Sequence, residues 1–412
     1  MSNVIVIGGG ASGMVSAYFA SKNNNVILIE QNEKLGKKLY ITGKGRCNLT
    51  NYCELDEFLS NVVSNPKFLM SSINGFTPKQ TYNFFEELGL KLKVERGNRV
   101  FPLSDKSSDV IKTLQNALVK ENVDIKLNEK VLSVSVVDDK IKKVTTDKGS
   151  YLAESVIIAT GGISYKSTGA TGDGYKFAKT FGHTVTSLAP SLCGINLKGE
   201  DYKSLQGLTL KNVSLKAVEN NKAYYFEQGE LLFTHYGISG PLVLTCSALS
   251  SRKNLQNVTF FIDLKPAMTI QELDKRVIRD FSINNKKELK NALDGLLPKA
   301  IIPLVISRSN IPPYKKTNDI TSIERSNLVS VLKNLEFKPI DLRGYEEAVI
   351  TSGGVSVKEI NPKTMESKLI KGVYFVGEVL DVDAFTGGFN LQIAFSTAKS
   401  AGVSIKNSEE LC

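Results

Sequence analysis

The sequence predicts an α/β fold in which a parallel sheet is interrupted by a β-rich part and then by a helical part. The first observation is a set of short apolar runs rich in valine and isoleucine, which are typical of buried parallel strands. The second is a helical pattern between the first two runs, which makes a strand–helix–strand unit at the start of the chain. The third is a change of pattern after residue 190, where short β-like segments precede helices.

These changes of pattern divide the 412 residues into three predicted domains. A discontinuous domain covers residues 1–189 and 337–412, a β-rich domain covers 190–266, and a helical insert covers 267–336. A chain of this length buries a large core without disulfides or a structural metal.

Strands are predicted where apolar runs are short and end in turns. The buried parallel strands are residues 3–8, 26–29, 155–159 and 373–376. The other predicted strands lie within 88–102, at 123–127, at 130–137 and 141–146 with a turn at Asp138-Asp139, at 213–218, 223–226 and 258–262, and within 338–356.

Helices are predicted where apolar residues recur with the helical period. In residues 105–121, for example, Val110, Ile111, Leu114 and Leu118 form one face. The predicted helices cover residues 11–22, 105–121, 271–281, 286–296, 300–307, 322–334 and 388–406.

The composition is that of an ordinary globular protein with a basic surface. Hydrophobic residues at 42% and charged residues at 23% exclude disordered, collagen-like and disulfide-rich classes. Lysine and arginine number 52 against 42 acids, a net charge of +10. The cations form dispersed pairs such as Lys142-Lys143, Lys286-Lys287 and Lys315-Lys316, which we interpret first as solvated surface, second as a site for an anionic small molecule and third as a nucleic-acid site. We therefore expect no nucleic-acid partner.

The sequence carries no pattern of a signal peptide or a membrane span, so we expect a cytoplasmic protein that does not bind membranes. Its five cysteines are scattered, which is typical of reduced thiols. Two histidines and no metal-ligand spacing predict no metal site.

Residues 8–13 form a glycine-rich turn between the first strand and the first helix, with the spacing G-x-G-x-x-G. Gly8 permits the tight turn, Gly10 lets a pyrophosphate approach the backbone, and Gly13 lets the helix pack on the strand. The helix start at Ala11-Ser12 offers unpaired N–H groups to the phosphates. Glu30 stands where an acid would bind the ribose hydroxyls. The unit is therefore predicted to be Rossmann-like and to bind a dinucleotide.

The C-terminal segment favours FAD over NAD. The last strand ends in Gly377-Glu378, and Asp381, Asp383 and the turn Gly387-Gly388 lead into a helix at Asn390-Leu391. FAD is an extended molecule, so its flavin end needs a second set of contacts far from the adenine site. A helix N-terminus stabilises the negative charge that gathers on the flavin during reduction.

A basic, glycine-rich segment follows the second strand. It contains Lys37-Lys38 and then Gly43-Lys44-Gly45-Arg46-Cys47-Asn48. We interpret it as a loop that wraps the pyrophosphate or lines the flavin, with a solvated loop as the alternative. The strand end at Thr160-Gly161 is a further candidate contact. Cys47 and Cys53 do not have the C-x4-C spacing of flavin disulfide reductases, so disulfide exchange is not expected.

Together these segments resemble a family of FAD flavoproteins with the glutathione-reductase-like fold. The family includes BaiN-type bile-acid reductases and aminoacetone-oxidase-like enzymes. The strings GKGRCNLTN (43–51) and GEVLDVDAFTGGFNLQ (377–392) carry the resemblance, which extends over nearly the whole chain. It implies an FAD domain interrupted by a β-barrel-like insert and a small helical domain. The chain departs from the family at Lys166, Ala384 and Phe389, where proline, glycine and tyrosine are expected.

The resemblance also implies which residues contact FAD. Glu30 and the backbone of Val131 are placed at the adenosine end. The remaining contacts it implies are Ala11, Ser12, Lys37, Lys38, Gly377, Glu378, Asp383, Asn390 and Leu391.

Within this family the first expected activity is an NADH- or NADPH-driven reductase of activated C=C bonds. Its implied substrates are 3-oxo-Δ4 or Δ4,6 bile-acid (steroid) intermediates, which are large, apolar and anionic. The alternatives are an aminoacetone-type amine oxidase that uses O2 and an RNA-binding flavoprotein. Because the chain shows one glycine-rich dinucleotide turn, we expect NAD(P)H and the substrate to use the same cavity in turn.

The residue that moves the proton is less well defined by the sequence. His235 is one candidate, since histidine exchanges protons near neutral pH, and a structural role at a strand end is its alternative. Tyr40 and Arg46 are the other candidates for contact with the flavin. His183 lies at a predicted helix end and is interpreted as structural.

Overall fold

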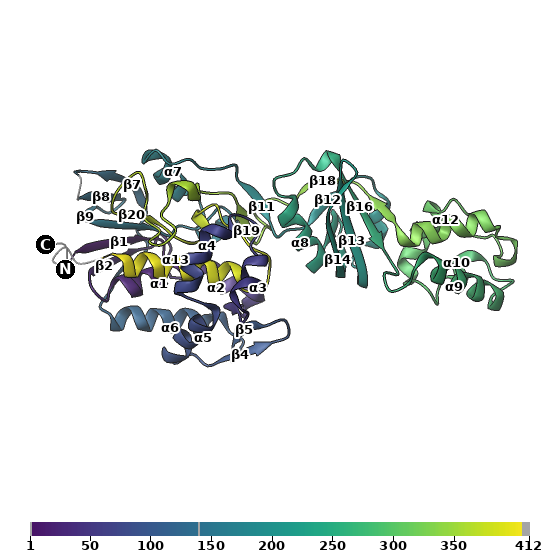
Figure 1. The fold of residues 1–412 in the computed structure, drawn as a ribbon, viewed down its shortest axis with the longest axis horizontal. Coiled ribbons are helices and arrows are strands. Elements are labelled where there is room, and N and C mark those ends of the chain that lie inside the picture. Colours follow the sequence, from purple (N-terminus) through teal and green to yellow (C-terminus); the bar gives the residue numbers. More distant parts are fainter. Residues whose placement is uncertain (1, 139–140, 406–412) are drawn as a thin grey trace. The chain divides into compact units, whose positions relative to one another are not determined.

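The computed structural model describes residues 2–138 and 141–405, which form two compact units (Figure 1). The first unit comprises residues 1–190 and 345–412, and the second comprises residues 191–344. The predicted turn residue Asp139, the predicted helix end at Lys406 and Cys412 lie outside the described residues. The predicted boundaries between the β-rich and helical domains stay a prediction.

The first unit is built on a parallel sheet of five strands in the order β20-β10-β1-β2-β6. Neighbouring strands are parallel throughout this sheet. All of β10 and nearly all of β1 are buried, as expected for apolar strands covered on both faces. The strands are β1 (Asn3–Ile7), β2 (Asn25–Ile29), β6 (Asp124–Lys126), β10 (Ser155–Ile158) and β20 (Val373–Phe375).

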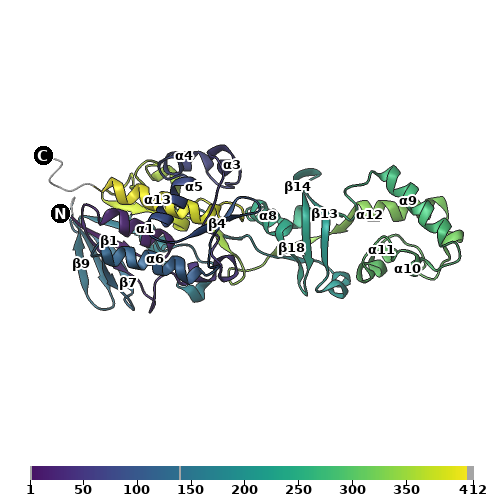
Figure 2. The ribbon, with the colours of Figure 1, turned by 90° about the horizontal axis from the view of Figure 1, so that it is seen from below.

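Helices from the two ends of the chain pack against each other in this unit. Helix α1 (Ala11–Ala20) lies beside α13 (Phe389–Ser404), as both views show (Figures 1 and 2). Their approach is close at Gly402, where a Cβ atom would lie 2.9 Å from the Ser16 carbonyl oxygen. The packing brings the N-terminal and C-terminal segments into one structure. The unit also contains α2 (Lys37–Ile41), α6 (Ser107–Lys120) and α7 (Asp173–Thr180).

Residues 55–87 form three helices that the sequence patterns did not predict. The third begins with a capping box, in which Thr77 and Gln80 each bond the other's backbone N–H, and with Pro78 in its first turn. That start signal was therefore present in the sequence. The helices are α3 (Leu55–Ser60), α4 (Pro66–Gly75) and α5 (Pro78–Glu87).

Three small sheets complete the first unit. The predicted strand–turn–strand at 88–102 is confirmed as a hairpin that pairs with a short third strand. The sheets contain β3 (Thr50–Asn51), β5 (Arg99–Pro102) and β4 (Leu92–Glu95); β7 (Val131–Val136), β8 (Lys142–Thr146) and β9 (Ser150–Ala153); and β11 (Ala189–Ser191) with β19 (Ile350–Ser352).

The second unit begins as an antiparallel sheet of seven strands in the order β17-β16-β13-β14-β15-β12-β18. Its edge strands, β17 (Leu335–Phe337) and β18 (Pro339–Leu342), are separated by a single residue. The sheet must therefore curl until its two edges meet, as a barrel-like insert requires. The inner strands are β12 (Ile195–Leu197), β13 (Thr209–Glu219), β14 (Lys222–Phe233), β15 (Gly237–Ser239) and β16 (Val258–Asp263).

The helices of the second unit share one apolar core with this sheet. The predicted helix at 286–296 is wrong in extent, since only Leu289–Ala292 is helical. The backbone before it pairs with another segment instead: Leu289 N–H donates to the Lys315 carbonyl at 2.9 Å, and Thr317 N–H to that of Lys287 at 3.0 Å. The helices are α8 (Pro241–Ser250), α9 (Ile270–Ile283), α10 (Leu289–Ala292), α11 (Ile302–Arg308) and α12 (Ser322–Lys333).

Across the described residues, we find no helix with the length and apolarity that crossing a membrane would require. The same residues contain no group of three or more His, Cys, Asp or Glu side chains placed to hold a metal ion.

Candidate functional site

The glycine turn between β1 and α1 has the geometry that a dinucleotide needs. At Gly13 a Cβ atom would lie 1.8 Å from the Gly8 carbonyl oxygen, so the helix can pack here only because the residue is glycine. At Gly10, by contrast, a Cβ atom would meet nothing within 4 Å. Gly10 is also the N-cap of α1, whose first turn has neither a capping side chain nor an acidic residue. The helix N-terminus therefore faces open space in which a pyrophosphate fits.

Glu30 lies at the end of β2 and its carboxylate is held against this turn. One oxygen accepts the Gly9 N–H at 2.7 Å, and the other accepts the Asn32 backbone and side-chain N–H groups at 2.8 and 2.6 Å. The Glu30 carbonyl accepts the Glu129 N–H at 3.1 Å, two residues before Val131 at the start of β7. The structure thus brings the two predicted adenosine contacts, Glu30 and Val131, to neighbouring strand ends.

The predicted lysines connect the two halves of the site. Lys38 Nζ lies 2.7 Å from one Glu378 carboxylate oxygen and 3.0 Å from the other. Lys37 Nζ donates to the Asn32 amide oxygen at 3.1 Å, beside Glu30. Close by, Gly377 faces α1, since a Cβ atom there would lie 2.7 Å from Ser12 Oγ. Contacts predicted from opposite ends of the sequence therefore form one continuous structure.

The segment after α2 has an unusual backbone. Gly43, Lys44, Gly45 and Cys47 all have φ between 57° and 84°, a region that non-glycine residues rarely adopt. Strain of this kind is typical of functional loops. The Asn48 side-chain oxygen next to it is buried and has no hydrogen-bond partner among the described residues. A buried amide oxygen without a partner fits a loop that contacts a bound ligand.

Cys47 is fully buried, and burial raises the pKa of its thiol to about 12. Burial also raises the pKa of Cys53 to about 12. Thiols with such high pKa values are poor nucleophiles.

The start of α13 is fixed by contacts with the N-terminal half. Gly388, its N-cap, has φ 100°, and a Cβ atom there would lie 2.4 Å from the Thr50 carbonyl group. Thr50 donates its hydroxyl to Gln392 at 2.6 Å. The Asn390 side chain bonds the backbone N–H and carbonyl of Ala384 at 3.0 and 2.8 Å, so it shapes the preceding turn. Helix α13, like α1, has no capping side chain or acid in its first turn.

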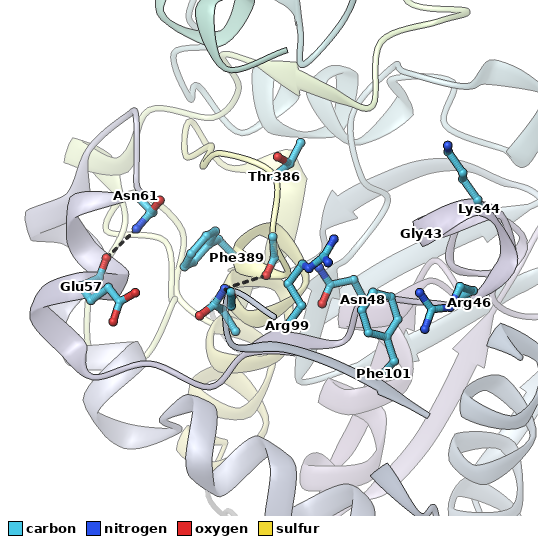
Figure 3. A pocket seen from close by; sticks show the side chains of 13 residues that line it. Gly43, Lys44, Arg46, Asn48, Glu57, Asn61, Arg99, Phe101, Thr386 and Phe389 are labelled. Carbon is cyan, nitrogen blue, oxygen red and sulfur yellow. Dashed lines mark hydrogen bonds between the residues drawn. The ribbon is translucent and has the colours of Figure 1, made fainter. Parts of the chain in front are cut away.

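A pocket of about 570 Å³ opens between the two strings that carried the family resemblance (Figure 3). Arg99 and Phe101 of β5 line it between the 43–51 segment and the turn before α13. A pocket of this size is ordinary for a small-molecule site. The lining residues are Gly43, Lys44, Arg46, Asn48, Asn51, Glu57, Asn61, Gly97, Arg99, Phe101, Thr386, Gly387 and Phe389.

The three cationic residues of the pocket differ in their partners. Arg46 contacts Glu95 and Asp105, each at 2.5 Å, and its guanidinium lies 4.1 Å from the centre of the Phe101 ring. These acids hold the pKa of Arg46 above its ordinary value and balance its charge. Lys44 and Arg99, however, make no ion pair with any described residue, and they leave positive charge for a ligand.

Sequence reasoning missed the residues that β5 and α3 bring to the pocket: Glu57, Asn61, Arg99 and Phe101. The hairpin that carries Arg99 was recognised as structure, but its position opposite residues 386–389 depends on long-range packing. The alternation of Arg99 and Phe101 on one strand face was the available signal.

The predicted catalytic residues belong to different units. Tyr40 is 52% exposed on α2, in the first unit with Arg46. His235 is exposed in the turn between β14 and β15 of the second unit, with its ring centroid 5.0 Å from that of Tyr236. The catalytic roles of Tyr40, Arg46 and His235 stay predictions. The buried His183 bonds Glu359 at 3.1 Å and Ser367 at 2.7 Å, which agrees with its structural interpretation.

The remaining predicted contacts all belong to the first unit. Thr160 and Gly161 follow β10 beside the glycine turn, where a Cβ atom on Gly8 would lie 2.7 Å from the Ala159 carbonyl oxygen. The buried Thr160 hydroxyl has no partner among the described residues. Asp383 is buried, and its carbonyl accepts the Val63 N–H at 2.8 Å. Leu391 lies in the first turn of α13 and packs against the core.

Comparison with known proteins places this geometry in a family. The model described as HI0933-like protein Rossmann domain matches residues 2–404. The chain is 30% identical to the 3-dehydro-bile acid delta(4,6)-reductase of Clostridium scindens and 32% identical to the ribosomal RNA dihydrouridine synthase of Haemophilus influenzae, with 98% of both chains covered in each case. These matches confirm the resemblance stated from the motifs, together with FAD as the cofactor.

A solved structure supports the fold independently. The 3-ketosteroid-delta4-(5alpha)-dehydrogenase of Rhodococcus jostii RHA1 aligns with a TM-score of 0.52 at 13% identity, covering 98% of this chain and 96% of that chain. At this identity the likeness shows the fold alone, and it confirms the predicted α/β class.

Proposed function

Because this chain belongs to the HI0933-like family, we propose that it reduces carbon–carbon double bonds conjugated with a carbonyl group and takes its electrons from NADH or NADPH. The protein is an FAD-dependent oxidoreductase. FAD held by the glycine turn and the start of α13 would supply the hydride-transfer chemistry between the nicotinamide and the substrate. Among the described residues, Cys47, Cys53, Cys193 and Cys246 form no disulfide, and this supports a cytoplasmic location as part of the proposal.

The single observation that carries this proposal is the reaction type that the two relatives share. A 3-dehydro bile acid has a C3 carbonyl group that is conjugated with its delta(4,6) double bonds. Dihydrouridine differs from uridine by two hydrogens across C5–C6, a bond conjugated with the C4 carbonyl. Each reduction adds a hydride to the carbon β to a carbonyl or its extended conjugate position, and a proton elsewhere on the conjugated system. Since this chain is about equally similar to both relatives, similarity supports the reaction and leaves the substrate open.

The pocket supplies the charge that this chemistry needs. Hydride addition places negative charge on the carbonyl oxygen, and donors preorganised around that oxygen lower the barrier. Arg99 and Lys44 are suited to this role because neither is balanced by an acid in the described structure. Arg46, whose charge is balanced by Glu95 and Asp105, would instead hold Phe101 in place.

Two substrate classes follow, and each has support. A 3-oxo-Δ4,6 steroid acid is large, apolar and anionic, and the bile-acid reductase supports it. Uridine within RNA is supported by the dihydrouridine synthase and by the net charge of +10.

The direct test is anaerobic stopped-flow spectroscopy of the FAD-loaded protein. NADH or NADPH should bleach the flavin, and a 3-oxo-Δ4,6 bile acid or a uridine-containing ribosomal RNA should restore its colour with two hydrogens added to the product. If neither nicotinamide bleaches the flavin while aminoacetone does, and peroxide accumulates in air, the protein is an oxidase and the proposal fails.

The order of binding gives a second test. With one dinucleotide turn in the sequence, NAD(P)H and substrate would reach the flavin through the same pocket. Initial rates at several fixed substrate concentrations should therefore give parallel double-reciprocal lines. A ternary complex that contains both ligands would contradict the shared pocket.

A further inference from the structure

Two lysine pairs that are separate in the sequence lie side by side in the second unit. Lys286-Lys287 follows α9, and Lys315-Lys316 precedes α12. The backbones of the two segments pair: an antiparallel bridge joins Glu288 to Lys316, and the hydrogen bonds described above join Leu289 to Lys315 and Lys287 to Thr317. The structure thus concentrates charge that the sequence shows as dispersed.

Part of this charge remains unbalanced at the surface. Lys315 is paired with Glu324 at 2.7 Å, and Lys290 with Glu288 at 3.1 Å. Lys286, Lys287 and Lys316 are exposed and form no ion pair within residues 2–138 and 141–405. Asp319, in the turn after Lys316, is a nearby acid, and the surface keeps a net positive charge.

An exposed aromatic ring lies in the same place. Tyr314 is 68% exposed, and Lys290 Nζ lies 4.2 Å from the centre of its ring. With the Lys290 ammonium group over one face, the exposed ring leaves its other face for a nucleobase to stack on while the phosphates of the same strand contact the lysines. We call Lys286, Lys287, Lys290, Tyr314 and Lys316 the basic patch.

We propose that the basic patch binds single-stranded RNA and that it selects RNA as the substrate class of this enzyme. The inference rests on the proposed function, in which uridine within RNA is one of two candidate substrates. A steroid acid offers one carboxylate and no base, so it would use neither several unpaired lysines nor an exposed tyrosine ring. RNA uses both, because its phosphates are regularly spaced and its bases stack on aromatic side chains.

The test is fluorescence anisotropy of the FAD-loaded full chain with a labelled, uridine-containing single-stranded RNA of about 20 nucleotides. The triple variant Lys286→Ala, Lys287→Ala, Lys316→Ala should bind at least about tenfold more weakly at about 150 mM salt. Each phosphate contact contributes about 0.7 to the slope of log affinity against log salt for single strands, so the slope should become shallower by about two. Tyr314→Ala should weaken binding by about fivefold or more, whereas Tyr314→Phe should not.

A matched control removes the same charge from the first unit. The variant Lys79→Ala, Lys112→Ala, Lys120→Ala changes three exposed lysines that form no ion pair in the described structure, and it should bind RNA like the wild type. Equal affinity of the two triple variants would overturn the inference. Binding of the patch to vesicles of phosphatidylglycerol and phosphatidylcholine, with no binding to RNA, would also overturn it.

The two proposals can fail separately. Anisotropy reports RNA binding whether or not any double bond is reduced. Reduction of a free 3-oxo-Δ4,6 steroid by NAD(P)H tests the chemistry without RNA, and the triple variant should retain any such activity because the patch lies outside the pocket. RNA binding without reduction of any substrate would refute the proposed function and leave the patch supported.

Discussion

The two units of the protein carry their charge in different ways. The first unit has 30 lysine and arginine residues against 27 acids, and the second has 22 against 15. Most of the net charge of +10 therefore belongs to residues 191–344. In the first unit, lysine and arginine side chains of the candidate site form ion pairs with acids of the same unit, as in Lys38–Glu378 and Arg46–Glu95.

This difference separates two kinds of recognition. The predicted cofactor contacts of the first unit depend on backbone geometry: a glycine turn, two uncapped helix starts and a loop with positive φ angles. The second unit offers exposed side chains, which suit a partner that is recognised by charge. Changes in the first unit should therefore alter FAD binding and chemistry, whereas surface changes in the second should alter the choice of substrate.

The largest effect is expected from a methyl group placed in the glycine turn, which tests whether the first unit binds FAD. Gly13→Ala puts a Cβ atom 1.8 Å from a backbone oxygen, so we expect loss of FAD and a stability loss of about 3 kcal/mol or more. Gly10→Ala meets nothing within 4 Å and should fold normally but bind FAD weakly, because the methyl group occupies the phosphate space. Thermal unfolding and flavin content of both variants give the answer. A Gly10→Ala protein with full FAD content would show that the phosphates lie elsewhere.

The next largest effect concerns Arg99 of the pocket, which donates to the Arg96 carbonyl at 3.0 Å but has no ion-pair partner among the described residues. Arg99→Met should lower kcat/KM for the enone about 100-fold, as loss of one donor to a developing oxyanion does, with FAD content unchanged. Arg96→Met, on the same hairpin but outside the pocket lining, is the control. Steady-state rates within about twofold of wild type for Arg99→Met would remove this residue from the mechanism.

Glu30 tests the identity of the cofactor. Glu30→Ala should weaken FAD binding about 10- to 100-fold, because it removes a charged hydrogen-bond acceptor at the ribose position and frees the Gly9 N–H. Equilibrium dialysis with FAD and FMN measures the effect, and Glu30→Gln should fall between the variant and the wild type. FMN released by heating the wild-type protein would contradict the interpretation of the whole turn.

A smaller effect is expected in the dependence of stability on pH. Burial lowers the pKa of His183 despite the Glu359 carboxylate at 3.1 Å, so the folded protein holds this ring neutral at pH 7. As the pH falls through about 6.5, the unfolded chain binds the proton first and stability is lost. His183→Gln should therefore lose less stability than wild type between about pH 7 and 5 in urea unfolding. The same pH dependence in His183→Gln and in the wild type would contradict this prediction.

The smallest effect is predicted for Cys47. With a pKa of about 12, about one thiol in ten thousand is ionised at pH 8. Cys47→Ala should therefore keep reductase activity within about twofold, and iodoacetamide should label Cys47 slowly in the folded wild-type protein. Rapid labelling, or activity lost in Cys47→Ala and restored in Cys47→Ser, would give this residue a role that its burial argues against.

The predicted cofactor-binding segments could be found from sequence because the patterns that mark them are local. The glycine turn, the strand before it and Glu30 lie within 30 residues and each has a fixed geometric role. The helices at 55–87 were missed, although the capping box at Thr77 marked one of them. The pocket could not be predicted in the same way, because Arg99 meets the turn before α13 through packing between distant segments.

The same limit applies to the basic patch. Two lysine pairs separated by nearly thirty positions have no pattern in common, and the predicted helix at 286–296 would have directed Lys286 and Lys287 differently. In the structure the backbone pairs at Glu288 and Lys316 where that helix was predicted, and this pairing brings the two lysine pairs together.

The order of strands in the central sheet determines when during synthesis the predicted cofactor site can be completed. Strand β10 pairs on one side with β20, and the predicted flavin contacts Asn390 and Leu391 lie in α13, so these parts are present only after residues 373–404 have been made. Residues 191–344 form a unit that is continuous in the chain and is synthesised before the second segment of the first unit. Until β20 has been synthesised, the edge of β10 that pairs with it stays unpaired. The predicted FAD site is therefore complete only after residues 373–404 have been synthesised.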